Sequence, residues 1–151
     1  MNNTFIDLAI DREIEAYDFY MDLYNRVTDK AAKEALKWIA GEEAKHKEFL
    51  IKYKEGKIPS GTLKMSVVDE QKIAEHVAAP EVKPNMDTKD VYLVAAHREL
   101  ASYNFYNEFA LTFTDGELKE MILKIANEEL KHKEKVEYLY SNTAFPQTSG
   151  G

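Results

Sequence analysis

The sequence contains no cysteine, only six glycines and four prolines among its 151 residues, and no long apolar run. Without cysteine the protein has no disulfide bond, no thiolate nucleophile and no zinc or iron–sulfur centre held by thiolates. The lack of cysteine is consistent with a reducing cytosol. The apolar run at 91–96 is far too short to cross a bilayer, and the first residues lack the basic flank and apolar core of a signal peptide. We therefore expect a cytoplasmic protein without membrane contact.

Charge and composition narrow the class of protein further. The formal net charge is −7 and the sequence has no basic cluster, which argues against a nucleic-acid partner. A hydrophobic content of 44% and a charged content of 31% are typical of a globular protein with a substantial core. Because glycine and proline are scarce while Glu, Lys, Ala and Leu are abundant, we predict an all-α fold.

The spacing of apolar residues predicts four helices and one long connection. Prolines interrupt residues 57–87, where only the stretch from Asp69 to Ala78 could form a short helix. Residues 142–151 are predicted to form a flexible tail. We predict one domain over residues 1–141, with helices at about 4–27, 29–55, 88–113 and 115–141.

An internal repeat explains the long connection. The second half of the sequence repeats the first at a constant offset of 86 positions, beginning at about residue 9 and ending at about residue 53 of the first copy. A two-helix unit has therefore been duplicated. A helix of about 26 residues is about 39 Å long, a distance that the connection at 57–87 can cover. This predicts a ferritin-like four-helix bundle, in which a long crossover joins two helical hairpins.

Each half of the sequence carries one Glu-x-x-His motif, Glu43 with His46 and Glu129 with His132. Residues three apart lie on the same face of a helix, so that both side chains of a motif could reach one bound ion. The motif alone is weak evidence in a chain rich in glutamate. Because the two halves are duplicates, the second copy adds no independent support.

Distance from the helix turns is the stronger constraint. Glu13 and Glu43 stand 15 residues before and after Thr28, and the same spacing recurs about Thr114. In an antiparallel hairpin, equal distance from the turn means equal height, and neighbouring helix axes lie about 8–10 Å apart. The sequence therefore predicts one layer of metal ligands in the core. The predicted ligands are Glu13, Glu43, His46, Glu99, Glu129 and His132.

Four glutamates at one level of an apolar core require compensation, because each buried carboxylate costs several kcal/mol and repels the others. Two divalent cations would balance the four carboxylates, and two neutral imidazoles would add ligands without adding charge. Oxygen and imidazole donors suit iron or manganese, and zinc could also bind. We predict two iron ions; the alternative is a structural polar layer without metal.

Two tyrosines follow predicted ligands by seven residues, Tyr20 after Glu13 and Tyr106 after Glu99. A buried tyrosine hydroxyl needs a hydrogen-bond partner, and a ligand carboxylate is the nearest acceptor on the same stripe. We predict that both tyrosines support the ligands and assist catalysis by acid–base chemistry. Alternatively, they are large core residues only.

Other prominent residues are predicted to serve the structure. Tyr17 and Trp38 are expected to pack in the core, and His97 is expected to lie on the surface. The charged runs around Lys47 and its copy Lys133 are expected to form solvated outer faces of their helices.

The pattern of ligands and tyrosines resembles the diiron domain of rubrerythrins, in the ferritin-like superfamily. The likeness covers almost the whole chain apart from the crossover and the tail. It implies that Glu43 and Glu129 bridge the two metal ions and that the other four ligands are terminal. The residues that carry it are Glu13, Ala16, Tyr20, Glu43, His46, Glu99, Ser102, Tyr106, Glu129 and His132.

Two departures from the rubrerythrin pattern bear on the reaction. Rubrerythrins carry a further glutamate one turn after the ligand of the third helix, and this chain has Ser102 there. Efficient peroxidase action by the rubrerythrin route is therefore in doubt. Full-length rubrerythrins also append a rubredoxin domain, whose cysteine ligands this chain lacks. The resemblance thus implies a stand-alone, erythrin-type protein that takes electrons from a separate donor, such as a rubredoxin-like protein.

The leading hypothesis is a diiron-carboxylate oxidoreductase that reduces peroxide or dioxygen. One alternative is a ferroxidase that stores or delivers iron, and another is a structural helical bundle without a redox role. We also expect a homodimer, in which the long crossover would permit exchange of helix pairs between two chains.

Overall fold

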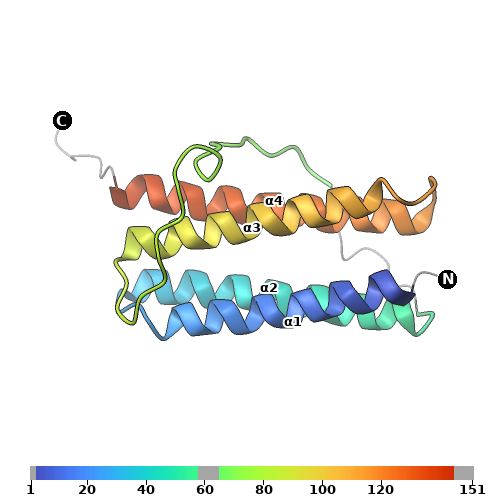
Figure 1. Ribbon diagram of the computed structural model, residues 1–151, viewed down its shortest axis with the longest axis horizontal. Coiled ribbons are helices and arrows are strands. Elements are labelled where there is room, and N and C mark those ends of the chain that lie inside the picture. Colours follow the sequence, from blue (N-terminus) through green and yellow to red (C-terminus); the bar gives the residue numbers. More distant parts are fainter. Residues whose placement is uncertain (1–2, 58–64, 145–151) are drawn as a thin grey trace. The chain divides into compact units, whose positions relative to one another are not determined.

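The computed structural model describes residues 3–57 and 65–144, and these residues form helices and connections without any strand. The chain divides into two compact units, Met1–Thr62 and Leu63–Gly151. Each unit is built on one antiparallel helical hairpin (Figure 1). The predicted all-α class with four helices is confirmed. The helices are α1 (Asn3–Tyr24), α2 (Lys30–Lys54), α3 (Thr88–Ala110) and α4 (Glu117–Ala144).

The ends of α2 are fixed by capping residues. The carboxylate of Asp29 accepts a hydrogen bond of 2.9 Å from the backbone N–H of Ala32, which satisfies one of the free donors at the start of the helix. After the last turn, Gly56 has a φ of +80°, a conformation that favours glycine. The N–H of Lys57 then donates back to the carbonyl of Lys52. Local sequence thus defines both ends of this helix.

Replacement of the cap, Asp29→Ala, is expected to lower the free energy of unfolding by about 1 kcal/mol, because the N–H of Ala32 loses its acceptor. Urea denaturation followed by circular dichroism would measure the loss. The control is Asp29→Asn, which keeps an acceptor oxygen and should remain within a few tenths of a kcal/mol of the wild type. Equal losses in both variants would contradict the capping role.

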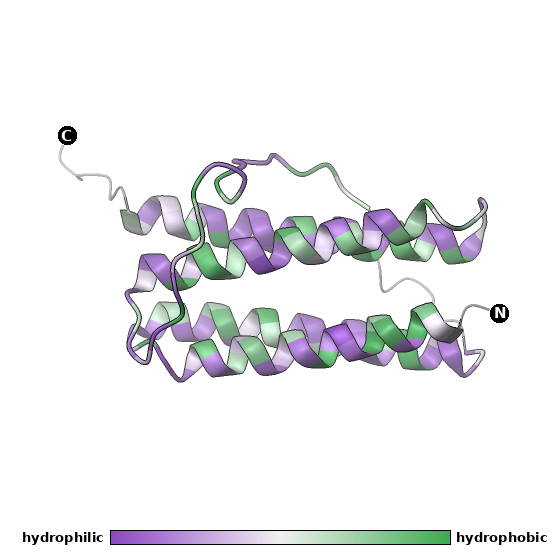
Figure 2. Cartoon of the chain, in the orientation of Figure 1, coloured by the Kyte–Doolittle hydropathy of each residue, from purple (hydrophilic) through white to green (hydrophobic). Residues whose placement is uncertain are grey.

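The first hairpin buries one side of each helix. Figure 2 shows hydrophobic and hydrophilic residues interleaved along α1 and α2, as expected for helices with one buried side. Two residues predicted to pack in the core lie largely outside it, because the side chains of Tyr17 and Trp38 are 40% and 39% exposed. The buried apolar residues of this hairpin include Ala9, Ala16, Tyr20, Leu23, Leu36, Ile39, Ala40 and Leu50.

The second unit contains α3, α4 and the described part of the crossover, residues 65–87. Helix α4 extends to Ala144 and so includes the start of the predicted tail. The rest of that tail, 145–151, and the crossover residues 58–64 lie outside the described residues. The buried apolar residues of the second hairpin include Val91, Ala95, Tyr106, Ile122, Ile125, Ala126 and Val136.

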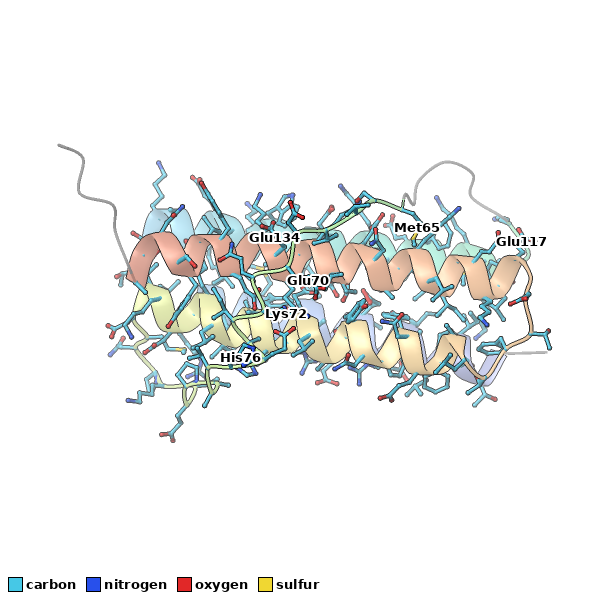
Figure 3. All side chains as sticks on the ribbon, turned by 90° about the horizontal axis from the view of Figure 1, so that it is seen from above. Met65, Glu70, Lys72, His76, Glu117 and Glu134 are labelled. Carbon is cyan, nitrogen blue, oxygen red and sulfur yellow. The ribbon has the colours of Figure 1, made fainter. Side chains whose placement is uncertain are left out.

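The crossover lies on α4 and then passes over α3 (Figures 1 and 3). Residues 74–76 form a turn, so the short helix considered for the stretch from Asp69 to Ala78 is wrong. Side chains of α3 and α4 bind the crossover along its path. These contacts join Ser66 to Asn127 through two hydrogen bonds, Gln71 to Ser141, Ala74 to Glu137, and Val77 to His97.

A buried charge cluster forms the centre of this attachment. The ammonium of Lys133 lies 2.9 Å from a carboxylate oxygen of Glu75 in the crossover and 3.2 Å from one of Glu137 in α4. The same Glu137 carboxylate accepts a hydrogen bond of 2.7 Å from the backbone N–H of Ala74. The side chains of Lys133 and Glu137 are 1% and 0% exposed. The prediction of a solvated outer face at Lys133 is therefore wrong, because the crossover covers it.

The attachment sites belong to the second copy of the repeat and are largely absent from the first. At the offset of 86 positions, Lys133 corresponds to Lys47, which is half-buried. The residues that bind the crossover by hydrogen bonds have no equivalent of the same type in the first hairpin. His97, Asn127, Glu137 and Ser141 correspond to Asp11, Gly41, Ile51 and Glu55. The two halves have therefore diverged where the crossover binds.

Candidate metal centre

The first hairpin brings together two glutamates and one histidine. Glu13 comes from α1, and Glu43 and His46 come from adjacent turns of α2. Each of them offers a ligand atom, and these three atoms lie within 4.8 Å of one another. Nδ1 of His46 lies 3.5 Å from Oε2 of Glu13. The three residues are 1–2% exposed, so the cluster is shielded from solvent.

The second hairpin repeats this arrangement. Glu99 comes from α3, and Glu129 and His132 come from α4. Nδ1 of His132 lies 3.5 Å from Oε1 of Glu129 and 3.7 Å from Oε1 of Glu99. The ligand atoms of the three residues again lie within 4.8 Å of one another, and the residues are 0–3% exposed. Each hairpin thus carries its own buried cluster of two carboxylates and one imidazole.

Local geometry explains how each cluster forms. Glu43 and His46 share one face of α2 because three residues are close to one helical turn. Glu13 meets them from the neighbouring helix because it stands as far before Thr28 as Glu43 stands after it. The spacing about Thr114 does the same for Glu99 in the second hairpin. The structure therefore brings together the three residues that the sequence placed at one height in each hairpin.

The donor set of each cluster fits a divalent metal ion. Two ionised carboxylates buried beside a neutral imidazole carry a charge of about −2, which is costly in an apolar interior. One divalent cation would neutralise that charge and use the three donors as ligands. Carboxylate oxygen and imidazole nitrogen together suit iron, manganese or zinc. Both clusters could hold a metal ion on these grounds.

The predicted supporting tyrosines lie in the buried stripes that contain the glutamates. Tyr20 and Tyr106 are 0% and 1% exposed. Each packs edge-on against the preceding phenylalanine, with ring centroids 5.7 Å apart for Tyr20 and 5.1 Å apart for Tyr106. Ser102 is also buried, one turn after Glu99. The acid–base role of the two tyrosines stays a prediction.

Sequence reasoning missed the charge cluster beside the second histidine. Lys133 directly follows His132 and is held by Glu75 and Glu137. A signal was present, because the apolar Ile51 of the first repeat is replaced by Glu137, four residues after a lysine. An acidic residue gained at this spacing can form an ion pair along a helix. Its burial, however, depends on the crossover and could not be read from the helix alone.

These features define an all-α protein in which each of two duplicated hairpins buries a glutamate–histidine cluster able to hold a metal ion. The Rubrerythrin family model matches residues 3–54, which contain α1, α2 and the first cluster. The first hairpin is therefore similar to the Rubrerythrin family. The second hairpin lies beyond the matched residues, and its relation to the first rests on the internal repeat.

No significant match was found among curated proteins or among solved structures. None of the helices in the described part of the chain combines the length and the apolar character needed to cross a bilayer.

Proposed function

We propose that the two clusters each bind one iron ion, and that these two ions are the centre of an oxidoreductase that reduces peroxide or dioxygen. The observation that carries this proposal is the buried cluster of two glutamates and one histidine, present once in each hairpin. Electrons would come from a separate donor of the rubredoxin type. A cytoplasmic location is part of the proposal, and the absence of cysteine is compatible with a reducing compartment.

Charge balance supports two ions rather than one. Four buried glutamates require about four positive charges, and two divalent cations supply them. The apolar neighbours Ile39, Ala40, Ile125 and Ala126 are buried as well, and they offer the carboxylates no compensating charge. When bound, the two iron ions would supply the electron-transfer chemistry of the reaction.

The chain would contribute fixed ligands, exclusion of water and proton transfer. The carboxylates and imidazoles would hold the ions in place. In each hairpin they come from two helices that pack against each other, with the cluster between them. The buried Ile39 and Ile125 would keep bulk water away from the ligands. The hydroxyls of Tyr20 and Tyr106 would move protons near the carboxylates of Glu13 and Glu99. Ser102, in place of the further rubrerythrin glutamate, makes the centre a symmetric form with four glutamates and two histidines.

Metal binding is the first test of the proposal. Anaerobic titration with Fe(II), followed by metal analysis, should give two ions per chain, because the chain carries two clusters. Glu43→Ala and Glu129→Ala should each lower the number of bound ions, or lower the affinity for Fe(II) by at least tenfold. The matched controls are Glu42→Ala and Glu128→Ala, which remove the adjacent half-buried glutamates and should bind as the wild type does.

The reaction itself is tested by stopped-flow oxidation of the diferrous protein. Rapid oxidation by peroxide or dioxygen, followed by reduction through a rubredoxin-like donor, would support the oxidoreductase. Iron uptake far above two ions per chain would instead indicate storage. Full retention of two ions in both Glu43→Ala and Glu129→Ala would overturn the assignment of the centre.

A further inference from the structure

The crossover is bound to α4 just before the ligands of the second cluster (Figure 3). The side chain of Asn127 accepts a hydrogen bond of 3.0 Å from the backbone N–H of Ser66 and donates one of 2.9 Å to the backbone carbonyl of the same residue. Asn127 lies two residues before Glu129, within the same helical turn. These two hydrogen bonds therefore anchor the turn of α4 that carries the first of its ligands.

A second anchor follows directly after the ligands. Lys133 is the residue after His132, and its ammonium is held by Glu75 of the crossover and by Glu137 of α4. Glu137 also accepts a hydrogen bond from the backbone N–H of Ala74. The side chains of Lys133 and Glu137 are buried, so this anchor is shielded from solvent. The segment of α4 that carries the ligands is thus attached to the crossover at both ends.

The backbone of the crossover shows that these anchors determine its path. Lys72 has a φ of +57°, a left-handed conformation that residues other than glycine rarely adopt. Its side chain is exposed, so packing of that side chain does not impose the conformation. The contacts on either side do, because Gln71 bonds to Ser141 and Ala74 bonds to Glu137. This part of the crossover is therefore held firmly on the second hairpin.

The corresponding segment of α2 lacks the residues that make these anchors. At the offset of 86 positions, Asn127 corresponds to Gly41 and Glu137 corresponds to Ile51, and neither has a polar side chain. Gly41 lies inside α2, two residues before Glu43, where glycine weakens a helix relative to alanine. A Cβ at Gly41 would meet no atom of the described residues within 4 Å beyond the local helix backbone, so packing does not require glycine there. The segment that carries the ligands in the first hairpin is therefore the less constrained one.

Constraint on the helix that carries the ligands affects metal affinity. A segment that is already held in place loses less conformational freedom when its side chains bind an ion. Removal of groups that orient metal ligands typically lowers the affinity by about 10- to 100-fold. Both clusters consist of two glutamates and one histidine, so the type of ligand cannot make them differ. The anchors of the crossover can.

We propose that the crossover is a positioning element of the second cluster, acting through Asn127, Lys133 and Glu137, and that this cluster binds its metal ion before the first cluster does. The proposal rests on the proposed function, because it treats both clusters as metal sites. The three residues are outside the donor set and act on the ligands only through α4. The centre would then fill in a fixed order, with the second hairpin first.

Amide hydrogen exchange of the metal-free, full-length chain tests the positioning role without any metal. Protection factors should be higher at 127–137 in α4 than at 41–51 in α2. The double variant Glu75→Ala/Asn127→Ala removes one ion pair and two hydrogen bonds, and should lower the protection at 127–137 by about tenfold without changing that at 41–51. Alanine is the better helix former, so the change at Asn127 does not itself weaken α4. Gly41→Ala should raise the protection at 41–51 by about twofold to fivefold.

Titration with Co(II), followed by visible absorption, tests the order of filling. The wild type should bind two ions in steps whose dissociation constants differ by about tenfold or more. His132→Ala should remove the tighter step, and His46→Ala should remove the weaker one. Added to His46→Ala, the double variant Glu75→Ala/Asn127→Ala should weaken the remaining step by about tenfold. The matched control is Glu70→Ala, which removes an exposed carboxylate of the crossover and should leave both steps unchanged.

The possible results separate this proposal from the proposed function. Two ions bound with equal affinity, or a tighter step that is lost in His46→Ala, would overturn the order of filling. Protection at 127–137 that is unchanged in the double variant would overturn the positioning role, provided that circular dichroism shows the wild-type helical signal. A chain with the expected exchange pattern that binds no Co(II) would overturn the proposed function, and the order of filling with it.

Discussion

Glu43→Gln and Glu129→Gln should each make the metal-free protein more stable while weakening its stabilisation by Fe(II). Both carboxylates are almost completely buried, beside a second glutamate of the same hairpin. In the absence of metal, removal of one charge relieves repulsion and the cost of keeping a carboxylate away from water. In the presence of metal, the same change removes a ligand. The sign of the effect should therefore reverse when the ion is added.

The expected magnitudes are within reach of equilibrium unfolding. In chelator, each variant should gain about 1–2 kcal/mol relative to the wild type. At a free Fe(II) concentration 100 times the dissociation constant, the wild type should gain about 2.7 kcal/mol for each bound ion, because the ion binds only the folded state. Each variant should gain less than the wild type, because one of its two clusters has lost a ligand. Anaerobic urea denaturation followed by circular dichroism gives the free energy of unfolding of the wild type and of each variant, with and without Fe(II).

Glu42→Gln is the control for Glu43→Gln, since it changes the neighbouring glutamate, which pairs with Lys45 on the half-buried side of α2. It should alter neither the stability in chelator nor the gain with Fe(II) by more than about 0.5 kcal/mol. A Glu43→Gln protein that is less stable than the wild type in chelator, yet keeps the full gain with Fe(II), would contradict a metal role for the cluster.

Loss of the buried lysine should be the most destabilising change outside the clusters. Lys133→Ala leaves the buried carboxylate of Glu137 without the ammonium 3.2 Å away, and also releases Glu75 of the crossover. Removal of one partner from a buried ion pair typically costs about 3–5 kcal/mol. Urea denaturation would measure this loss. Lys47→Ala changes the equivalent lysine of the first hairpin, which is only half-buried, and should cost less than about 1 kcal/mol.

A double variant separates the ion pair from the packing around it. Lys133→Met combined with Glu137→Gln removes both charges but keeps an acceptor for the backbone N–H of Ala74. The double variant should be more stable than Lys133→Met alone, because no uncompensated charge remains buried. Additive losses from the two changes would show that Lys133 and Glu137 act independently.

The site follows from sequence more directly than most of the fold does. Equal spacing about Thr28 fixes Glu13 and Glu43 at one height, because an antiparallel hairpin of regular helices leaves little freedom. The three-residue spacing then adds His46. These constraints are local to one hairpin, so they need no knowledge of the rest of the chain. The same reasoning reaches His132 and its neighbours through the repeat.

Features that depend on the crossover could not be predicted in this way. The sequence of α4 places Lys133 on the outer side of the helix, and only the crossover makes that side interior. The turn at 74–76 forms in a segment whose composition also allowed a helix. One contact that holds the turn joins Ala74 to Glu137, 63 residues further along the chain, and the local sequence does not reveal it. Tyr17 and Trp38 show the opposite case. Their large aromatic side chains suggest a position in the core, but both lie on the exposed side of their helices.

The crossover also makes the two copies of the internal repeat structurally unequal. Its described anchors are side chains of α3 and α4, so it serves the second hairpin as a covering arm as well as connecting the two copies. The second copy depends on the segment that precedes it, because it carries Glu137 where the first copy carries Ile51. A buried glutamate at that position is tolerable only where the arm and Lys133 accompany it. The first copy has an isoleucine at that position, which needs no such partner.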